Sequence, residues 1–139
     1  MGAVLIQIQG TPPDNVVRFV VLGEPKSKQR PRVTQRGTFT PKETVVAENK
    51  IRDCWRKLNH PQFVLSVLVE IDFFNGNRRR RDLDNMAKLV LDALNKEAFE
   101  DDSLVVELNL RKFFCEKNRA RTEIVIRELG EIPKELELK

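Results

Sequence analysis

The segment FVLSVLVEIDFF, at residues 63–74, constrains the fold of this chain more than any other stretch. Apolar side chains recur at every second position, which is the period of a β-strand. The residues of this apolar face are Val67, Val69, Ile71 and Phe73. The opposite face carries Glu70 and Asp72 among apolar neighbours, so it is only partly apolar. Such a strand predicts a sheet with other elements packed on one face.

The patterns before this strand predict a shorter strand, a loop and a helix. The β-branched run VVRFVVL at 16–22 is typical of a buried strand. Two prolines, two glycines and many cations in residues 23–37 predict an exposed loop. Apolar residues at helical spacing then predict an amphipathic helix over 41–58. They are Ala47, Ile51, Cys54, Trp55 and Leu58.

This first helix has signals at both ends. Thr40 is expected to cap its N-terminus, Pro41 suits the first helical position, and Glu43 completes a capping box. Pro61 forces the helix to stop before it.

A second helix is predicted at residues 84–96, capped by Asp82 or Asp84. Its inner face consists of Met86, Leu89, Val90, Ala93 and Leu94, continued by Glu97. Strands at 104–114 and 121–128 flank the polar turn EKNR and are expected to form a hairpin.

The order β-α-β-α-β-β predicts an α+β fold in which two main helices pack on one mixed sheet. The length suggests one domain over residues 1–139. Residues 1–10 could add an edge strand, and residues 130–139 have the composition of a charged tail.

The composition argues against several classes of protein. No apolar run approaches the roughly 20 residues of a membrane span, and we expect no signal peptide at the uncharged N-terminus. A lone His60 argues against zinc and serine–histidine chemistry. Cys54 and Cys115 lie far apart, so they predict two buried thiols in a reducing, cytoplasmic setting.

Basic residues gather in two clusters of a chain whose net charge is +4, which favours a polyanionic partner such as nucleic acid. The first cluster is Lys26, Lys28, Arg30, Arg32 and Arg36, and the second is Arg78, Arg79, Arg80 and Arg81.

Acidic residues gather on both sides of the second helix. Asp82 and Asp84 precede it, and Asp101 and Asp102 follow it. Each place has an ordinary explanation, because helix N-termini favour carboxylates and loops tolerate solvated ones. Brought together, however, these carboxylates would repel one another unless a cation neutralised them. Oxygen ligands select a hard ion, so the pattern predicts Mg²⁺ or Mn²⁺.

A bound metal ion and nearby cations can hydrolyse a phosphodiester without a nucleophilic side chain. Lys88 lies one turn beyond Asp84, from where it could reach the reacting phosphate or the leaving oxygen. The ordinary explanation for Lys88 is an i, i+4 ion pair with Asp84.

Three stretches resemble motifs of the RusA-type Holliday junction resolvases: GEPKSKQRPR (23–32), RRRRDLDNMAKLVLDALNK (78–96) and FEDDSLV (99–105). The resemblance covers about residues 17–128 and leaves residues 1–15 as an extension. It implies a homodimer that cleaves four-way DNA junctions with Mg²⁺ or Mn²⁺, in DNA recombination and repair. The implied metal ligands are Asp82, Asp84 and one of Asp101 and Asp102, with Asp102 favoured, and the implied basic catalytic residue is Lys88. The two basic clusters are then expected to bind DNA.

The predicted helix poses a geometric problem for this metal site. Residues 84–96 would span about 20 Å, so residues 97–103 could return that distance only if nearly extended, at about 3.3 Å each. The loop could fold back along the helix, the helix could end early, or a partner chain could supply a carboxylate. We expect the fold-back within one chain.

The sequence is also compatible with two other functions. A non-enzymatic nucleic-acid-binding module would explain the basic clusters but not the aspartates, which should weaken DNA binding. A small phosphohydrolase acting on nucleotides would explain the metal-binding aspartates, but it would not need the long basic loop. For a resolvase, the two-fold symmetry of the junction favours a homodimer. Its interface is expected at Phe113 and Phe114 or at the helix that carries Trp55.

Overall fold

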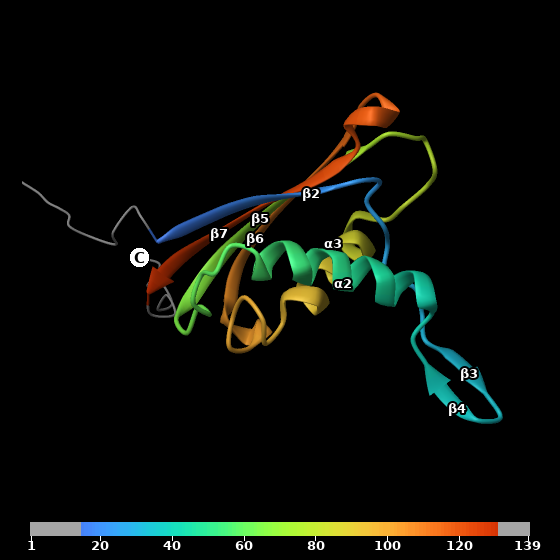
Figure 1. Cartoon of the computed structure of the whole chain (residues 1–139), viewed down its shortest axis with the longest axis horizontal. Helices are drawn as coiled ribbons and strands as arrows, with labels where there is room; N and C mark the ends of the chain where they lie inside the picture. Colours follow the sequence, from blue (N-terminus) through green and yellow to red (C-terminus); the bar gives the residue numbers. More distant parts are fainter. Residues whose placement is uncertain (1–14, 131–139) are drawn as a thin grey trace, which may run out of the picture.

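The computed structural model describes residues 15–130, which form a mixed sheet with two helices on it (Figure 1). The main elements are β2 (Val16–Leu22), β3 (Arg32–Thr34), β4 (Gly37–Phe39), α2 (Lys42–Arg56), β5 (Ser66–Asn75), α3 (Leu83–Leu94), β6 (Val105–Phe114) and β7 (Arg121–Gly130). Two short 3₁₀ helices, η1 (Asp102–Leu104) and η2 (Lys117–Arg119), flank β6. The predicted α+β class is confirmed. The edge strand expected at 1–10 and all but the first residue of the charged tail lie outside the described residues.

The sheet has the strand order β2-β7-β5-β6, so the predicted hairpin of β6 and β7 is wrong. β7 pairs antiparallel with both β2 and β5, whereas β6 pairs parallel with β5. A parallel pair needs a long crossover connection, and α3 supplies it. This arrangement gives the apolar strand β5 a neighbour on each side.

The core lies between β5 and the two helices. The inward residues of β5, which are Val67, Val69, Ile71 and Phe73, are at most 1% exposed, as the two-residue period predicts. α3 covers them with its predicted apolar face, and all of that face is buried. α2 adds Ile51 and Trp55, and the Trp55 ring packs edge-on against Phe19 of β2 with 6.1 Å between centroids. Alternation on the strand and helical spacing on α3 therefore identified the core correctly.

The N-terminus of α2 differs from the prediction. Pro41, not Thr40, is the N-cap, and no side chain caps the helix. Pro41 has an extended backbone, and its carbonyl accepts hydrogen bonds from the N–H groups of Thr44 and Val45. Leu58 lies beyond the end of the helix and is exposed.

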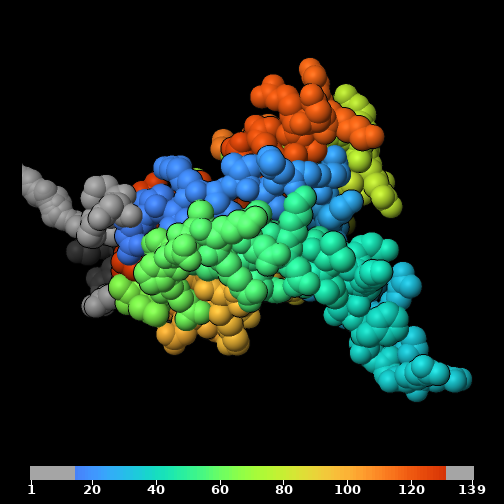
Figure 2. Space-filling view, in the orientation of Figure 1, coloured from blue at the N-terminus to red at the C-terminus, as the bar shows by residue number. Residues whose placement is uncertain are grey.

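The predicted loop at 23–37 is partly ordered into secondary structure. Its second half forms the exposed β3–β4 hairpin, which projects from the body of the molecule beside the start of α2 (Figures 1 and 2). Cys54 and Cys115 are free thiols, but both are only partly buried, which corrects the expectation of buried cysteines. No helix in residues 15–130 is long and apolar enough to cross a membrane.

The first half of the same loop, residues 24–29, is a strap bound to both helices. The Lys28 Nζ atom lies 2.6 Å from Oε2 of Glu48 on α2 and 3.1 Å from Oδ2 of Asp92 on α3. The backbone N–H of Lys28 also donates to the carbonyl of Asn85. Burial by itself lowers the pKa of Lys28, but hydrogen bonds and charges from Glu48 and Asp92 outweigh burial and raise it. Lys28 therefore holds the strap and the two helices together as a permanent cation.

At its other end the strap contacts the loop after β5. The Glu24 carboxylate accepts hydrogen bonds from the N–H of Gly76, at 3.0 Å, and from Nη1 of Arg81, at 3.1 Å. A Cβ atom on residue 76 would lie 2.7 Å from Cα of Lys117, so the close approach of η2 requires glycine there. These contacts fix the strap, the arginine-rich loop and η2 at one end of the molecule.

Replacing Lys28 with Met should destabilise the fold by about 1.5–3 kcal/mol, since hydrogen bonds to charged groups are lost and two carboxylates lose their main partner. The free energy of unfolding in urea measures this loss. Lys26→Met, an exposed position in the same strap, is the matched control and should change stability by less than about 0.5 kcal/mol. Equal stability of the two variants would contradict a structural role for Lys28.

Candidate metal and nucleic-acid site

Two of the predicted metal ligands lie at the N-terminus of α3. Asp82 is the N-cap residue by its extended backbone, but its side chain forms no capping hydrogen bond. Asp84, in the first turn, accepts one hydrogen bond from the N–H of Asn85 at 2.9 Å. Both carboxylates are exposed, and neither is in an ion pair with another residue of the range 15–130. They are therefore free to bind a cation.

The other acidic pair lies at η1, and its two members differ. The Asp101 carboxylate caps η1 by accepting a hydrogen bond from the N–H of Ser103 and also pairs with Lys96 at 3.3 Å. The Ser103 hydrogen bonds, followed by that from Lys96, lower the pKa of Asp101. Asp102 instead uses its backbone N–H, which donates to Oδ1 of Asn95 at 2.8 Å, and leaves its carboxylate exposed. This difference supports Asp102 over Asp101 as the ligand.

A groove of about 440 Å³ between α3 and β6 gathers several of these residues. Asp84, Lys88 and Asp92 line it at successive helical turns, and Asp102 lines it from η1. Apolar residues from β6, including Val106 and Leu108, complete the groove. It is thus an open cleft in which most of the charged groups lie on α3 and η1 and most of the apolar ones on β6.

The groove does not bring the predicted metal ligands close enough together to bind the same ion. No three acidic, histidine or cysteine residues within 15–130 lie close enough together to hold a metal. α3 ends at Leu94, earlier than predicted, and Lys96 turns the chain back with a φ of 64°. The returning chain reaches only the C-terminal end of the helix, because Asp102 is hydrogen-bonded to Asn95. Asp84 begins the same helix, so the expected single-chain cluster is not formed in this part of the chain.

Lys88 extends into solvent from the groove wall. Its Nζ lies 3.6 Å from Oδ2 of Asp92, so the expected ion pair with Asp84 is replaced by one with the following turn. The same Asp92 oxygen contacts Lys28. The sequence analysis did not predict that Asp92 pairs with Lys88 and Lys28. Its position four residues after Lys88 on a helix could have predicted the first of these ion pairs.

Most of the predicted DNA-binding cations are exposed. The exposed residues of the two basic clusters are Lys26, Arg30, Arg32, Arg36, Arg78, Arg79 and Arg80. The guanidinium carbon of Arg78 lies 5.1 Å from the centre of the Phe114 ring.

Two members of the basic clusters have internal partners instead. Lys28 is held by Glu48 and Asp92, as described above. The Arg81 side chain is only 7% exposed and donates to Glu24 and to the side-chain oxygens of Asn75 and Asn77. The structure therefore does not support a DNA contact for either residue.

The two basic clusters, far apart in sequence, meet in a hollow of about 350 Å³. Lys26 and Gln29 of the strap line one side, and Arg79 and Arg80 line the other. The strap also crosses the first turn of α3, because Lys28 N–H donates to the Asn85 carbonyl. The basic hollow thus adjoins the end of α3 that carries Asp82 and Asp84. This geometry suits a phosphate backbone that contacts the basic side chains of the hollow and continues toward the carboxylates of Asp82 and Asp84.

Comparison with known proteins identifies related sequences. The family described as "Endodeoxyribonuclease RusA" matches residues 23–127, which is most of the chain. The chain is 40% identical over 67 residues to the crossover junction endodeoxyribonuclease RusA of Escherichia coli K12, a match that covers 48% of this chain and 55% of the relative. The enzyme of the same name from Enterobacteria phage 82 gives the same figures.

A protein from Bacillus subtilis strain 168, the uncharacterized protein YqaN, is 48% identical over 49 residues, which cover 35% of this chain and 33% of YqaN. The chain spans about half the length of the curated nucleases that it matches. The family match, in contrast, extends from the strap to the last strand. The chain therefore belongs to the RusA family of endodeoxyribonucleases.

Proposed function

We propose that this protein is a divalent-metal-dependent endonuclease that cleaves four-way DNA junctions in DNA recombination and repair. One observation carries the proposal: members of both basic clusters line a hollow beside the N-terminal end of α3, and Asp84 and Lys88 of the same helix line the groove. The relatives named crossover junction endodeoxyribonuclease support the junction as substrate.

The donor set fits Mg²⁺ or Mn²⁺. Asp82, Asp84 and Asp102 offer only oxygen atoms, which hard cations prefer, and their carboxylates are exposed and free of ion pairs among residues 15–130. When bound, the ion would lower the pKa of a coordinated water and stabilise charge on a phosphate oxygen.

The protein side chains then position the substrate and stabilise its charge. Arg79, Arg80 and Lys26 hold the phosphate chain beside the N-terminus of α3. Lys88 is long and exposed, so its ammonium can leave Asp92 and approach the scissile phosphate or the leaving oxygen. Positive charge placed where negative charge develops lowers the barrier.

A homodimer would complete the acidic site. β6 is an edge strand of the sheet in the described part of the chain, and it exposes four large apolar side chains, two of which also line the groove. They are Val106, Leu108, Phe113 and Phe114. An unpaired apolar edge is a template for a second strand, and two-fold dimers are the commonest oligomers. Trp55, in contrast, is buried within its own chain, so that residue is not available for an interface.

Two-fold pairing of β6 edges would also bring the carboxylates of Asp82 and Asp84 close to that of Asp102, although they are far apart within one chain. In such a pair the two α3 helices run antiparallel across the axis. The end that carries Asp82 and Asp84 then lies opposite the end that carries Asp102 of the partner subunit. Each dimer would hold two metal sites, one for each of two symmetry-related strands.

We place this activity in the cytoplasm. Both cysteines are free, which agrees with a reducing compartment. The substrate, cellular DNA, is found there as well.

Metal binding should depend on all three aspartates. Asp82→Asn, Asp84→Asn and Asp102→Asn should each weaken Mn²⁺ binding at least about tenfold, since even changes next to a metal ligand cost about 10–100-fold. Titration of the free-Mn²⁺ electron paramagnetic resonance signal measures the affinity. Asp53→Asn, an exposed position on α2, is the control and should bind as the wild type does. Unchanged affinity in all three variants would rule out this donor set.

One gel assay separates the proposed function from its rivals. The protein is incubated with a four-way junction, a linear duplex of the same sequence and a nucleotide, each with and without Mg²⁺. We expect paired nicks in the junction, only with Mg²⁺, and no cut in the duplex. The three aspartate variants should still shift the junction on a native gel, because they keep the basic surface.

Other results would favour the alternatives. A protein that shifts the junction but never cuts it would be a binding module. A protein that hydrolyses only the nucleotide would be a small phosphohydrolase.

A further inference from the structure

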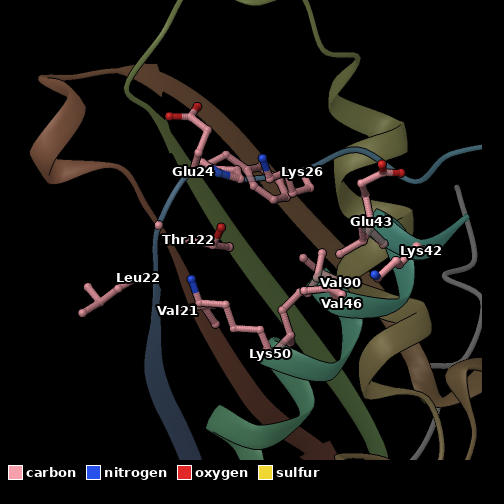
Figure 3. Close-up of a pocket in the computed structure, with 16 residues that line it drawn as sticks. Val21, Leu22, Glu24, Lys26, Lys42, Glu43, Val46, Lys50, Val90 and Thr122 are labelled. Atoms are coloured by element: carbon pink, nitrogen blue, oxygen red, sulfur yellow. The ribbon is translucent and has the colours of Figure 1, made fainter.

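A cavity of about 520 Å³ opens between β2, β7 and the two helices (Figure 3). It shares no lining residue with the groove. Its walls are apolar and come from several elements: Val21, Val46, Ile51, Phe73, Leu89 and Val90. Val46 of α2 and Val90 of α3, both labelled in Figure 3, contribute to this lining. The volume is typical of a small-molecule pocket.

The mouth of this cavity is positively charged. Lys26, Lys42 and Lys50 line it, and none of the three forms an ion pair with another residue of the range 15–130. Lys50 reaches across the cavity toward the end of β2, where its Nζ would lie 2.6 Å from a Cβ atom on residue 23. Of the two glutamates at the mouth, Glu24 is already neutralised by Arg81. An apolar interior with a cationic mouth suits a ligand with a flat apolar body and an anionic group.

The cavity adjoins the basic hollow, because Lys26 and Glu43 line both. Ser27, which also lines the hollow, has a buried hydroxyl oxygen without a hydrogen-bond partner among the described residues. Buried polar atoms are normally satisfied, so this hydroxyl would take a water or a ligand atom as its partner. A DNA strand on Arg79 and Arg80 would pass the mouth of the cavity.

We propose that this cavity binds one nucleotide extruded from the DNA. Its base enters the apolar interior, and its phosphate lies between Lys42, Lys50 and Lys26. The inference rests on the proposed function for its substrate, and it adds a base-binding site separate from the carboxylates. Extruding a base costs least where stacking is already interrupted, and the branch point of a junction is such a place. Thr122 also lines the cavity, and its hydroxyl would be a partner for the edge of the base.

Methyl-labelled protein and free nucleotides test the pocket without DNA cleavage. The probes are the four deoxynucleoside 5′-monophosphates, with inorganic phosphate as a separate arm. Nucleotides should shift the methyl resonances of Val21, Leu89 and Val90, and phosphate alone should not. Lys50→Gln should weaken nucleotide binding about tenfold, as expected when a charge-assisted hydrogen bond is lost.

Two variants of α2 form a matched pair. Val46 lines the cavity and is 58% exposed, whereas Val45 is 41% exposed and does not line it. Val46→Phe should fill the mouth and abolish the methyl shifts, and Val45→Phe should leave them as in the wild type. Both sites are on the surface of a helix, so both proteins should fold, which their thermal unfolding checks.

The second arm uses a junction with 2-aminopurine at the branch point, in EDTA so that no strand is cut. The wild type and Val45→Phe should raise its fluorescence several-fold, and Val46→Phe should not. Absence of methyl shifts with all four nucleotides, in a protein that still cleaves junctions, would overturn this inference alone. Nucleotide binding by a protein that never cleaves junctions would support the pocket and overturn the proposed function instead.

Discussion

The ion-pair cluster of Lys28 with Glu48 and Asp92 is the interaction on which the functional end of the molecule depends. One ammonium group joins the strap to both helices, with Nζ–O distances of 2.6 and 3.1 Å. The strap in turn places Lys26 in both the basic hollow and the apolar cavity. Glu24, through Arg81 and Gly76, adds the arginine-rich loop to the same unit. Without these contacts the two basic clusters would have no fixed position relative to α3.

Local periodicity predicted the elements, but not how the strands pair. The alternation in β5 and the helical spacing in α3 identified the core residues, because each pattern is contained within one element. The predicted hairpin failed for a different reason. β6 and β7 are neighbours in sequence, yet they pair with opposite edges of β5 and not with each other. Which strands pair is decided by the sheet as a whole and not by the pattern of any one strand.

The same distinction applies to the site. The sequence predicted that Asp82 and Asp84 lie at the start of the second helix and that Asp102 follows its end. The structure agrees and places the three carboxylates on the surface. The internal roles of Lys28 and Arg81 were missed, because their partners lie 20 and 57 residues away in sequence. The length of α3 separates Asp84 from Asp102, and no single-chain cluster forms within residues 15–130. That separation and the apolar edge of β6 are the reasons why we propose a site shared between two subunits.

Mixing two inactive variants tests this shared site most directly. One chain carries Asp82→Asn and Asp84→Asn, and the other carries Asp102→Asn. In a mixed dimer with shared sites, one site receives Asp82 and Asp84 from the second chain and Asp102 from the first, so it is fully intact. We expect mixed dimers, isolated through two different affinity tags, to nick one strand of a four-way junction although neither parent does. Isolated mixed dimers that bind the junction and never nick it would contradict the shared site.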